Sequence, residues 1–249
     1  MALDTYSTAQ YACERILAWQ GITVASATDA QKAGALTLVN EAYREVCRGV
    51  YLDEDGGLQQ HVWSFLTATD TTTMSFAAEA YYADLPSDYD GMVEPPLYPY
   101  SATAAGPGLN LKWVSPHEFL RRRRDSETSG IPEVYTVRPK TFVAATGQKY
   151  EMAIDPAAET AVVLQIRYRQ LVTAVTYSAL VAFRGPTSFP DLIVQCVKAR
   201  EELWRGQVLG PETRKYQHTM REFVRHDAEL FGDSDIVTSF TQLESGLSV

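Results

Sequence analysis

Carboxylates gather in one short stretch of the chain, where Asp84, Asp88 and Asp90 surround Pro86. A spaced pair of carboxylates can serve as general acid and as nucleophile or base in glycoside hydrolysis. The same residues also build turns, because an aspartate side chain can bond nearby backbone and Pro86 holds Leu85 extended. We favour the turn interpretation, and a hydrolase with its active site in a β domain is the alternative.

Two other groups contain residue types that bind metals. His218, Glu222 and His226 recur four residues apart, which places them on one face of a helix where they could hold an ion. Residues 53–57 are acidic and glycine-containing, as in a calcium loop, but the twelfth position would be Ser64 instead of glutamate. We interpret the first group as a charged helix exterior and the second as a solvated turn, and we expect no metal site.

Motifs for nucleophilic, phosphate or cofactor chemistry are missing from the sequence. There is no GxSxG, no P-loop, no HExxH and no GxGxxG after a strand. His61 and His117 have no plausible triad partners in the neighbouring sequence. We therefore expect no catalytic residues, no cofactor and no enzymatic activity.

One basic run could contact a partner. It consists of Arg121, Arg122, Arg123 and Arg124, and such a run could bind an acidic neighbour or DNA phosphates. Four consecutive residues point in different directions around a helix, however, which favours a solvated helix end. Both interpretations stay open, and the four arginines are candidate partner-contact residues.

The last 17 residues, 233–249, carry apolar side chains without helical periodicity. This pattern fits a frayed terminus or an arm that becomes ordered on a partner, since disordered segments usually hold fewer large apolar residues. We predict an arm that docks on a neighbouring protein. Its candidate contact residues are Ile236, Val237, Phe240, Leu243 and Leu247.

Composition narrows the class of protein. The formal net charge of -9 argues against tight binding to the outside of nucleic acid, which needs a basic face. No run approaches the roughly 20 apolar residues of a membrane helix, and the N-terminus shows no secretory signal. Cys47 and Cys196 lie on apolar helix stripes and read as buried, reduced thiols, which favours assembly in a reducing cytoplasm.

Helices are predicted at both ends of the chain. Ser7 as N-cap with Gln10 at N3 forms a capping box, and Thr28 with Gln31 forms a second. Ser188 and Gly210 precede two further helices, each with a proline in its first turn. We expect residues 1–50 and 188–232 to pack together as one helical bundle.

The middle of the chain has the period of strands. Residues 51–183 are predicted to form an inserted antiparallel β-sheet or sandwich domain, so the fold class is α+β. Ser115 and Pro116 open one short helix over residues 116–124, and residues 95–108 are predicted as an irregular loop. The predicted strands are residues 62–67, 72–82, 109–114, 134–138, 141–145, 149–154 and 161–169.

The order of these features resembles the bacteriophage head-to-tail adaptor family, which includes connector, gatekeeper and tail tubular protein A-like proteins. Residues 38–46, Leu-Val-Asn-Glu-Ala-Tyr-Arg-Glu-Val, resemble the family's second helix. Residues 82–89, Tyr-Ala-Asp-Leu-Pro-Ser-Asp-Tyr, resemble its Leu-Pro-x-Asp-aromatic joint. Further similar segments are residues 63–65, 71–73, 114–120, 130–135, 166–169 and 189–193. The order and spacing of these motifs over residues 36–204 carry the resemblance.

The resemblance implies a structural protein of the virion, made in the cytoplasm of the bacterial host and located in the neck between capsid and tail. Such proteins form a homo-oligomeric ring, commonly of twelve copies, that binds the portal protein and the tail tube or nozzle. Genomic DNA passes through the lumen without sequence-specific binding, and no membrane is involved. Another tail completion or neck protein is the alternative within the virion.

Overall fold

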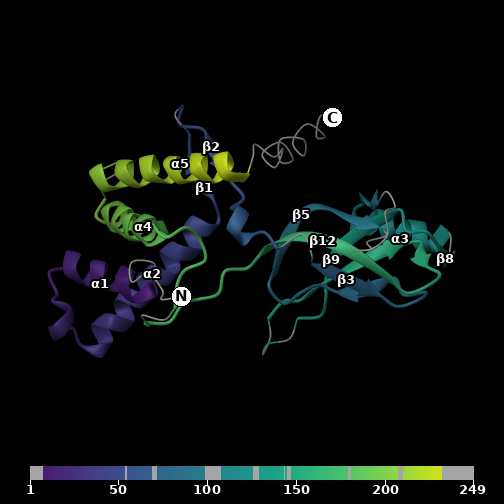
Figure 1. The fold of residues 1–249 in the computed structure, drawn as a ribbon, viewed down its shortest axis with the longest axis horizontal. Helices are drawn as coiled ribbons and strands as arrows, with labels where there is room; N and C mark the ends of the chain where they lie inside the picture. The colour runs from purple at the N-terminus through teal and green to yellow at the C-terminus, as the bar shows by residue number, and fades with distance from the viewer. Residues whose placement is uncertain are drawn as a thin grey trace. The chain divides into compact units, whose positions relative to one another are not determined.

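The structure is a computed structural model that divides into two compact units. The helical unit comprises Met1–Leu66 and Val172–Val249, and the β unit comprises Thr67–Leu171. In Figure 1 the β unit carries the blue-to-green colours of the middle of the chain. The residues described are 8–53, 55–68, 72–98, 108–125, 129–142, 144, 147–178, 181–206 and 210–231.

The observed unit boundaries differ from the predicted limits at Tyr51 and Phe183. A short hairpin after the second helix belongs to the helical unit, because Leu52 N donates to Gln217 Oε1 at 3.1 Å. Val175 and Phe183 are buried in the helical core on the other side of the insertion. The inserted β unit is therefore shorter than the sequence pattern indicates.

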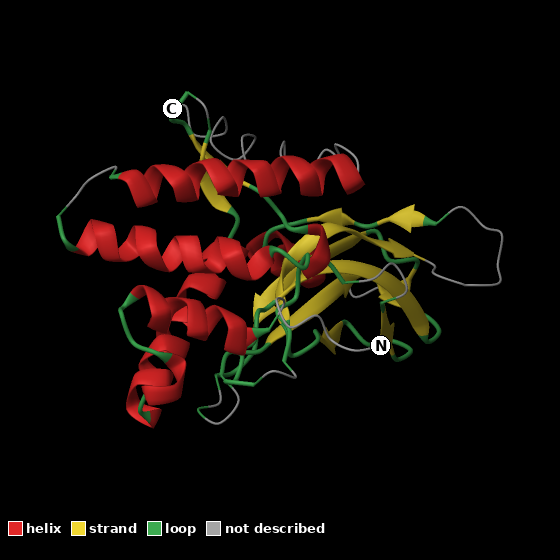
Figure 2. Cartoon of the chain, turned by 60° about the vertical axis from the view of Figure 1, so that its left-hand side comes forward, coloured by secondary structure: helices red, strands yellow, loops and turns green. Residues whose placement is uncertain are grey.

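The helical unit is built around α4, which packs against α1, α2 and α5. Figure 2 shows α4 and α5 lying side by side among the red helices, as in Figure 1. The apolar face of α4 includes Leu192, Ile193 and Val197, all buried. The elements are α1 (Ala9–Trp19), η2 (Val24–Ser26), α2 (Asp29–Cys47), β1 (Val50–Leu52), β2 (Leu58–Gln60), η3 (Ser64–Leu66), α4 (Phe189–Trp204) and α5 (Pro211–Phe231).

Local capping sets where the first two helices begin. The predicted capping box of α2 is confirmed, because Thr28 and Gln31 bond each other's backbone reciprocally. The first helix starts one residue later than predicted. Thr8 is its N-cap and accepts from Tyr11 N at 3.3 Å, whereas the predicted N-cap Ser7 lies outside the described residues.

The strand predicted over residues 62–67 is wrong, since η3 occupies Ser64–Leu66. Trp63 is only 1% exposed and its indole Nε1 donates to Val46 O at 2.8 Å, which fixes the chain against the end of α2. Leu66 is buried in the same core. The apolar alternation there arises from side chains that anchor a tight turn, which a period of two cannot distinguish from a strand.

The β unit contains two four-stranded sheets whose side chains share one core. The order β3 (Thr73–Phe76), β12 (Val162–Gln170), β5 (Tyr89–Tyr98), β6 (Leu109–Asn110) forms one sheet. The order β4 (Tyr82–Asp84), β10 (Tyr150–Asp155), β9 (Val134–Pro139), β7 (Lys112–Trp113) forms the other. A short parallel pair joins β8 (Ser129–Gly130) to β11 (Ala157–Ala158). One face of β12 points into this core, since Val162, Leu164, Ile166 and Tyr168 are buried.

Three predicted β segments need correction. The single strand 72–82 is broken into β3 and β4 by a turn in which Glu79 has a φ of 59°. Residues 109–114 supply two strands of different sheets. The described residues of the segment 141–145 form no strand. The sheet to which a strand belongs depends on pairing partners that are distant in sequence. The local pattern of apolar residues carries no information about those partners.

The predicted loop 95–108 also begins too early, because Pro95 and Pro96 lie within β5. Pro96 still contributes an acceptor, since Leu111 N donates to its carbonyl at 2.9 Å. Pairing of β5 with β12 shows register shifts, the irregular strand geometry in which proline is tolerated. Residues 99–107 lie outside the described residues.

The short helix α3 (Pro116–Asp125) packs against β9 and β10. Its N-cap is as predicted, because Glu118 N donates to Ser115 Oγ at 3.2 Å. Phe119 is 1% exposed and packs with Val114, Val134 and Ala153 in a small second core. Burial of this one ring holds the helix on the sheet and leaves its other faces free for polar side chains.

Candidate interaction site

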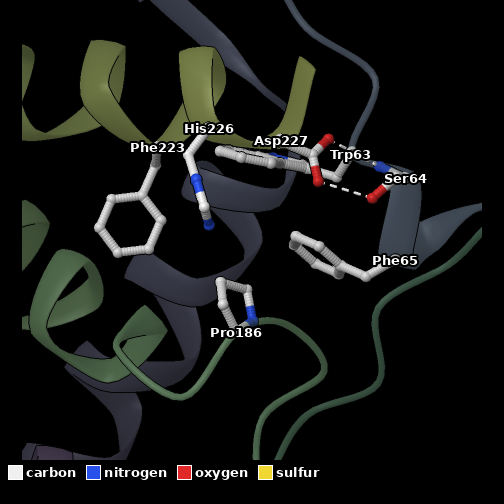
Figure 3. A pocket seen from close by; sticks show the side chains of 7 residues that line it. All are labelled: Trp63, Ser64, Phe65, Pro186, Phe223, His226 and Asp227. Atoms are coloured by element: carbon white, nitrogen blue, oxygen red, sulfur yellow. Dashed lines mark hydrogen bonds between the residues drawn. The ribbon is translucent and has the colours of Figure 1, made fainter. Parts of the chain in front are cut away.

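An apolar pocket of about 210 Å³ lies within the helical unit. Its walls come from η3 and the residue before it, from the loop that leads into α4, and from the second half of α5 (Figure 3). In Figure 3 the imidazole of His226 points into the space between the other side chains. The lining residues are Trp63, Ser64, Phe65, Pro186, Phe223, His226 and Asp227.

Ring packing holds the pocket walls in place. Trp63 and Phe65 stack with centroids 5.4 Å apart, and Phe65 meets the buried ring of Phe189 edge-on at 5.1 Å. Phe189 also contacts Phe223, with centroids 6.2 Å apart. Such offset and edge-to-face contacts are favourable beyond the apolar area they bury. These ring contacts fix the positions of the pocket walls relative to one another.

Asp227 joins α5 to the start of η3 beside this pocket. Its carboxylate accepts from Ser64 N at 3.0 Å and from Ser64 Oγ at 2.6 Å, and it lies 2.8 Å from His61 Nε2. Burial acts to raise the pKa of Asp227, but the bonds from His61 and Ser64 outweigh it and the net shift is downward. We call these three residues the Asp227 clasp.

The clasp contains serine, histidine and aspartate, yet its order is not that of a nucleophilic triad. A triad needs the hydroxyl bonded to the imidazole, which then takes its proton. Here Ser64 and His61 both bond the carboxylate, so the hydroxyl is directed at Asp227 and not at the imidazole. The arrangement suits positioning of the chain. Sequence reasoning missed it because His61 and Asp227 are 166 residues apart.

The basic run on α3 separates into inward and outward side chains, as helical geometry predicts. Arg121 and Arg122 both pair with Glu118, at 2.8 and 3.3 Å. Arg123 lies over the Tyr81 ring, 4.1 Å from its centroid, and donates to Tyr82 Oη at 2.6 Å. Hydrogen bonds and charge from Arg121 and Arg122 lower the pKa of Glu118 to about 2. Arg121 and Arg124 are exposed and are the members of the run best placed to contact a partner. That contact stays a prediction.

The carboxylates that surround Pro86 each have a partner of their own. Asp84 pairs with Lys140 at 2.6 Å, and Asp90 pairs with Arg169 at 2.8 Å. Asp88 accepts from Tyr168 Oη at 2.9 Å and from Gln170 at 2.8 Å. These contacts tie β4 and β5 to neighbouring strands, which supports the turn interpretation over general acid–base chemistry.

The metal candidates have other contacts. Glu222 pairs with Arg225 at 2.6 Å, while His226 lines the pocket. Asp53 accepts from Gly57 N at 2.6 Å and from Gln59 Nε2 at 3.0 Å, as expected for a hairpin turn. Across the described ranges, no group of three or more His, Cys, Asp or Glu side chains is placed to hold an ion.

Several predicted features concern burial and the chain end. Cys13, Cys47 and Cys196 are buried free thiols, as predicted for the last two. None of the helices in the described part of the chain combines the length and apolarity needed to cross a membrane. The predicted contact residues of the C-terminal arm, Ile236, Val237, Phe240, Leu243 and Leu247, all lie outside the described residues.

The chain matches no protein-family model, and a search of curated proteins finds no significant relative.

Proposed function

We propose that this chain is a structural protein of a bacteriophage virion, a head-to-tail adaptor that forms a ring between portal and tail. The observation that carries the proposal is the order of its motifs on an α+β fold, in which a β unit interrupts a helical unit. Portal protein and tail tube or nozzle are its proposed partners, and DNA would pass through the ring.

The family-like joint at residues 82–89 occupies a structurally defined place. Residues 82–84 form β4 of one sheet, and Tyr89 begins β5 of the other. Leu85 is buried and donates its N–H to Tyr150 O at 3.0 Å, and Tyr89 N closes a turn onto Pro86 O at 3.1 Å. The motif is thus the connection between the two sheets, and this role supports reading it as a fold signature.

The charge of the chain is compatible with a DNA passage. A net charge of -9 keeps non-specific attraction to phosphates low, and the one basic run is partly neutralised by Glu118. A heterologous contact repeated around a closed axis gives a ring. These points support an adaptor, and they are also compatible with another neck or tail completion protein.

The test is to mix the purified chain with the portal protein of the same genome and to examine it by light scattering and negative-stain electron microscopy. We expect a ring, commonly of twelve copies, bound coaxially to the portal. A chain that stays monomeric and does not bind the portal contradicts the proposal. Binding elsewhere in the particle, seen by labelling the virion, favours the alternative neck or tail completion role.

The hydrolase alternative has its own test. Asp88→Asn and Asp90→Asn remove the two carboxylates that a sugar-active mechanism would need. We expect neither variant to change any glycosidase activity relative to the parent chain, because both carboxylates have structural partners. A measured activity that is lost in these variants revives the enzyme hypothesis.

A further inference from the structure

The pocket of the helical unit has a mostly apolar lining that offers water few hydrogen-bond partners. Phe65 and Phe223 are half-buried, and Pro186 and His226 are exposed at its edge. The polar atoms of Ser64 and Asp227 already bond each other, so water inside would find few partners, and an apolar group that displaces it gains affinity. A volume of about 210 Å³ is below the 300–1,000 Å³ of drug-sized sites and suits one large side chain.

The position of the pocket on α5 points to its occupant. Phe223, His226 and Asp227 line it, and α5 ends at Phe231. The next residue in the sequence is Gly232, and a glycine directly after a helix commonly ends it and lets the chain change direction. The end of α5 lies four residues beyond Asp227, the last residue of the pocket wall.

Chain length decides which apolar residue can return. The axial distance from Phe231 back to Phe223 is about 12 Å at 1.5 Å per residue. Five residues lead from Phe231 to Ile236 and span at most about 17 Å, which leaves little room for a reversal. Nine residues lead to Phe240 and span up to about 30 Å. Phe240 has the reach and the aromatic ring to pack edge-to-face against the pocket walls.

We propose that the pocket binds the phenyl ring of Phe240 from the same chain. Residues 232–249 lie outside the described residues, and the proposal concerns what their sequence can fill. A short tether gives the segment an effective concentration in the millimolar range, which favours the same chain over a second copy. The apolar residues beyond Phe240 in the sequence are Leu243, Leu247 and Val249. This inference is independent of the adaptor function.

Cysteine pairing in the full-length chain tests the contact. The three native cysteines are buried, so introduced thiols are the reactive ones. We expect His226→Cys with Ser239→Cys, which keeps the Phe240 ring, to form a disulfide within one chain under mild oxidation. His218→Cys with Ser239→Cys is the matched control, because His218 is an exposed residue two turns earlier on α5, and it should stay reduced.

Mixing two differently tagged versions of the double variant identifies the occupant. A bond between the two tags shows that a second copy fills the pocket and overturns the same-chain proposal. Absence of a bond, or equal bonding at positions 218 and 226, overturns the contact itself. Neither result bears on ring formation with the portal, so failure here leaves the adaptor proposal standing.

A second measurement uses Trp63 as a reporter in the pocket wall. Trp19, Trp113 and Trp204 are 37%, 55% and 73% exposed, so their replacement by Phe leaves Trp63 as the single tryptophan at little structural cost. In this background we expect Phe240→Ala to shift Trp63 emission to the red, because water then replaces the phenyl ring beside the buried indole. Leu247→Ala is the control and should leave the emission unchanged. Equal behaviour of the two variants overturns the proposal.

Discussion

The Asp227 clasp in the helical unit and the arginine run in the β unit use charge in different ways. The Asp227 side chain is 11% exposed and three donors of two residues converge on it. Arg121 and Arg124 on α3 are exposed, and Arg121 and Arg122 share one carboxylate on the same helix. Exposed ion pairs contribute about 0–1 kcal/mol, whereas removing one partner from a buried charged network costs several times more. The conspicuous charges in the sequence are therefore not the ones that hold the fold.

The largest expected effect comes from breaking the clasp. Asp227→Ala leaves the Ser64 N–H and hydroxyl without their acceptor, and we expect the free energy of unfolding to fall by about 2–4 kcal/mol. Urea denaturation followed by circular dichroism measures it. Glu222→Ala is the matched control on the same helix, because its pair with Arg225 is exposed. Equal losses in the two variants contradict the comparison.

The clasp also makes stability depend on pH. The pKa of Asp227 is lowered below its ordinary value of 3.8 in the folded chain, so the unfolded chain takes up the proton first as the pH falls. The contribution of Asp227 is complete above about pH 4 and is lost as the pH falls through the lowered folded value. Urea denaturation at pH 3 and pH 6 should show a smaller acid loss in Asp227→Asn than in the parent chain. An identical acid loss contradicts this assignment.

Within the arginine run we expect unequal effects. Arg123→Ala removes a contact with two tyrosine rings and a bond to Tyr82, which should cost about 1–2 kcal/mol. Arg124→Ala alters an exposed side chain and should stay within about 0.5 kcal/mol. Thermal unfolding of both variants checks the difference. A larger cost for Arg124 than for Arg123 contradicts the inward and outward assignment.

The smallest effects are expected at the joint between the sheets. Asp88→Ala removes the acceptor of Tyr168 and Gln170, which should cost about 1 kcal/mol. Asp84→Ala breaks an exposed pair with Lys140 and should cost less than about 0.5 kcal/mol. Denaturant midpoints rank the two variants. If Asp84 proved the costlier residue, the account of the joint would be wrong.

The features that sequence analysis predicted well are those set by neighbours in the chain. The capping box at Thr28 and Gln31, the N-cap at Ser115 and the alternation of β12 each depend on residues a few positions apart. The α+β class follows from the same periodicities. Such local rules act before tertiary packing, so the printed sequence contains them.

The features that were missed depend on partners far along the chain. Trp63 is anchored by Val46, and Ser64 by Asp227, 163 residues away. The division of residues 109–114 between two sheets likewise follows from pairing with β5 and β9. The pocket joins segments from both ends of the sequence, and no local signal marks it. The spacing of apolar residues on α5 could have suggested that Phe223 is packed. It could not have identified Phe189 as the ring that Phe223 contacts.

The central claim is that the chain forms a ring in the neck of a virion. Cryo-electron microscopy of the neck, with the fold fitted as two independent units, tests it most directly. The account predicts a ring of copies between portal and tail, with DNA or an open channel on its axis. Density for this chain elsewhere in the particle, or a neck whose proteins leave no place for its helical and β units, contradicts the account.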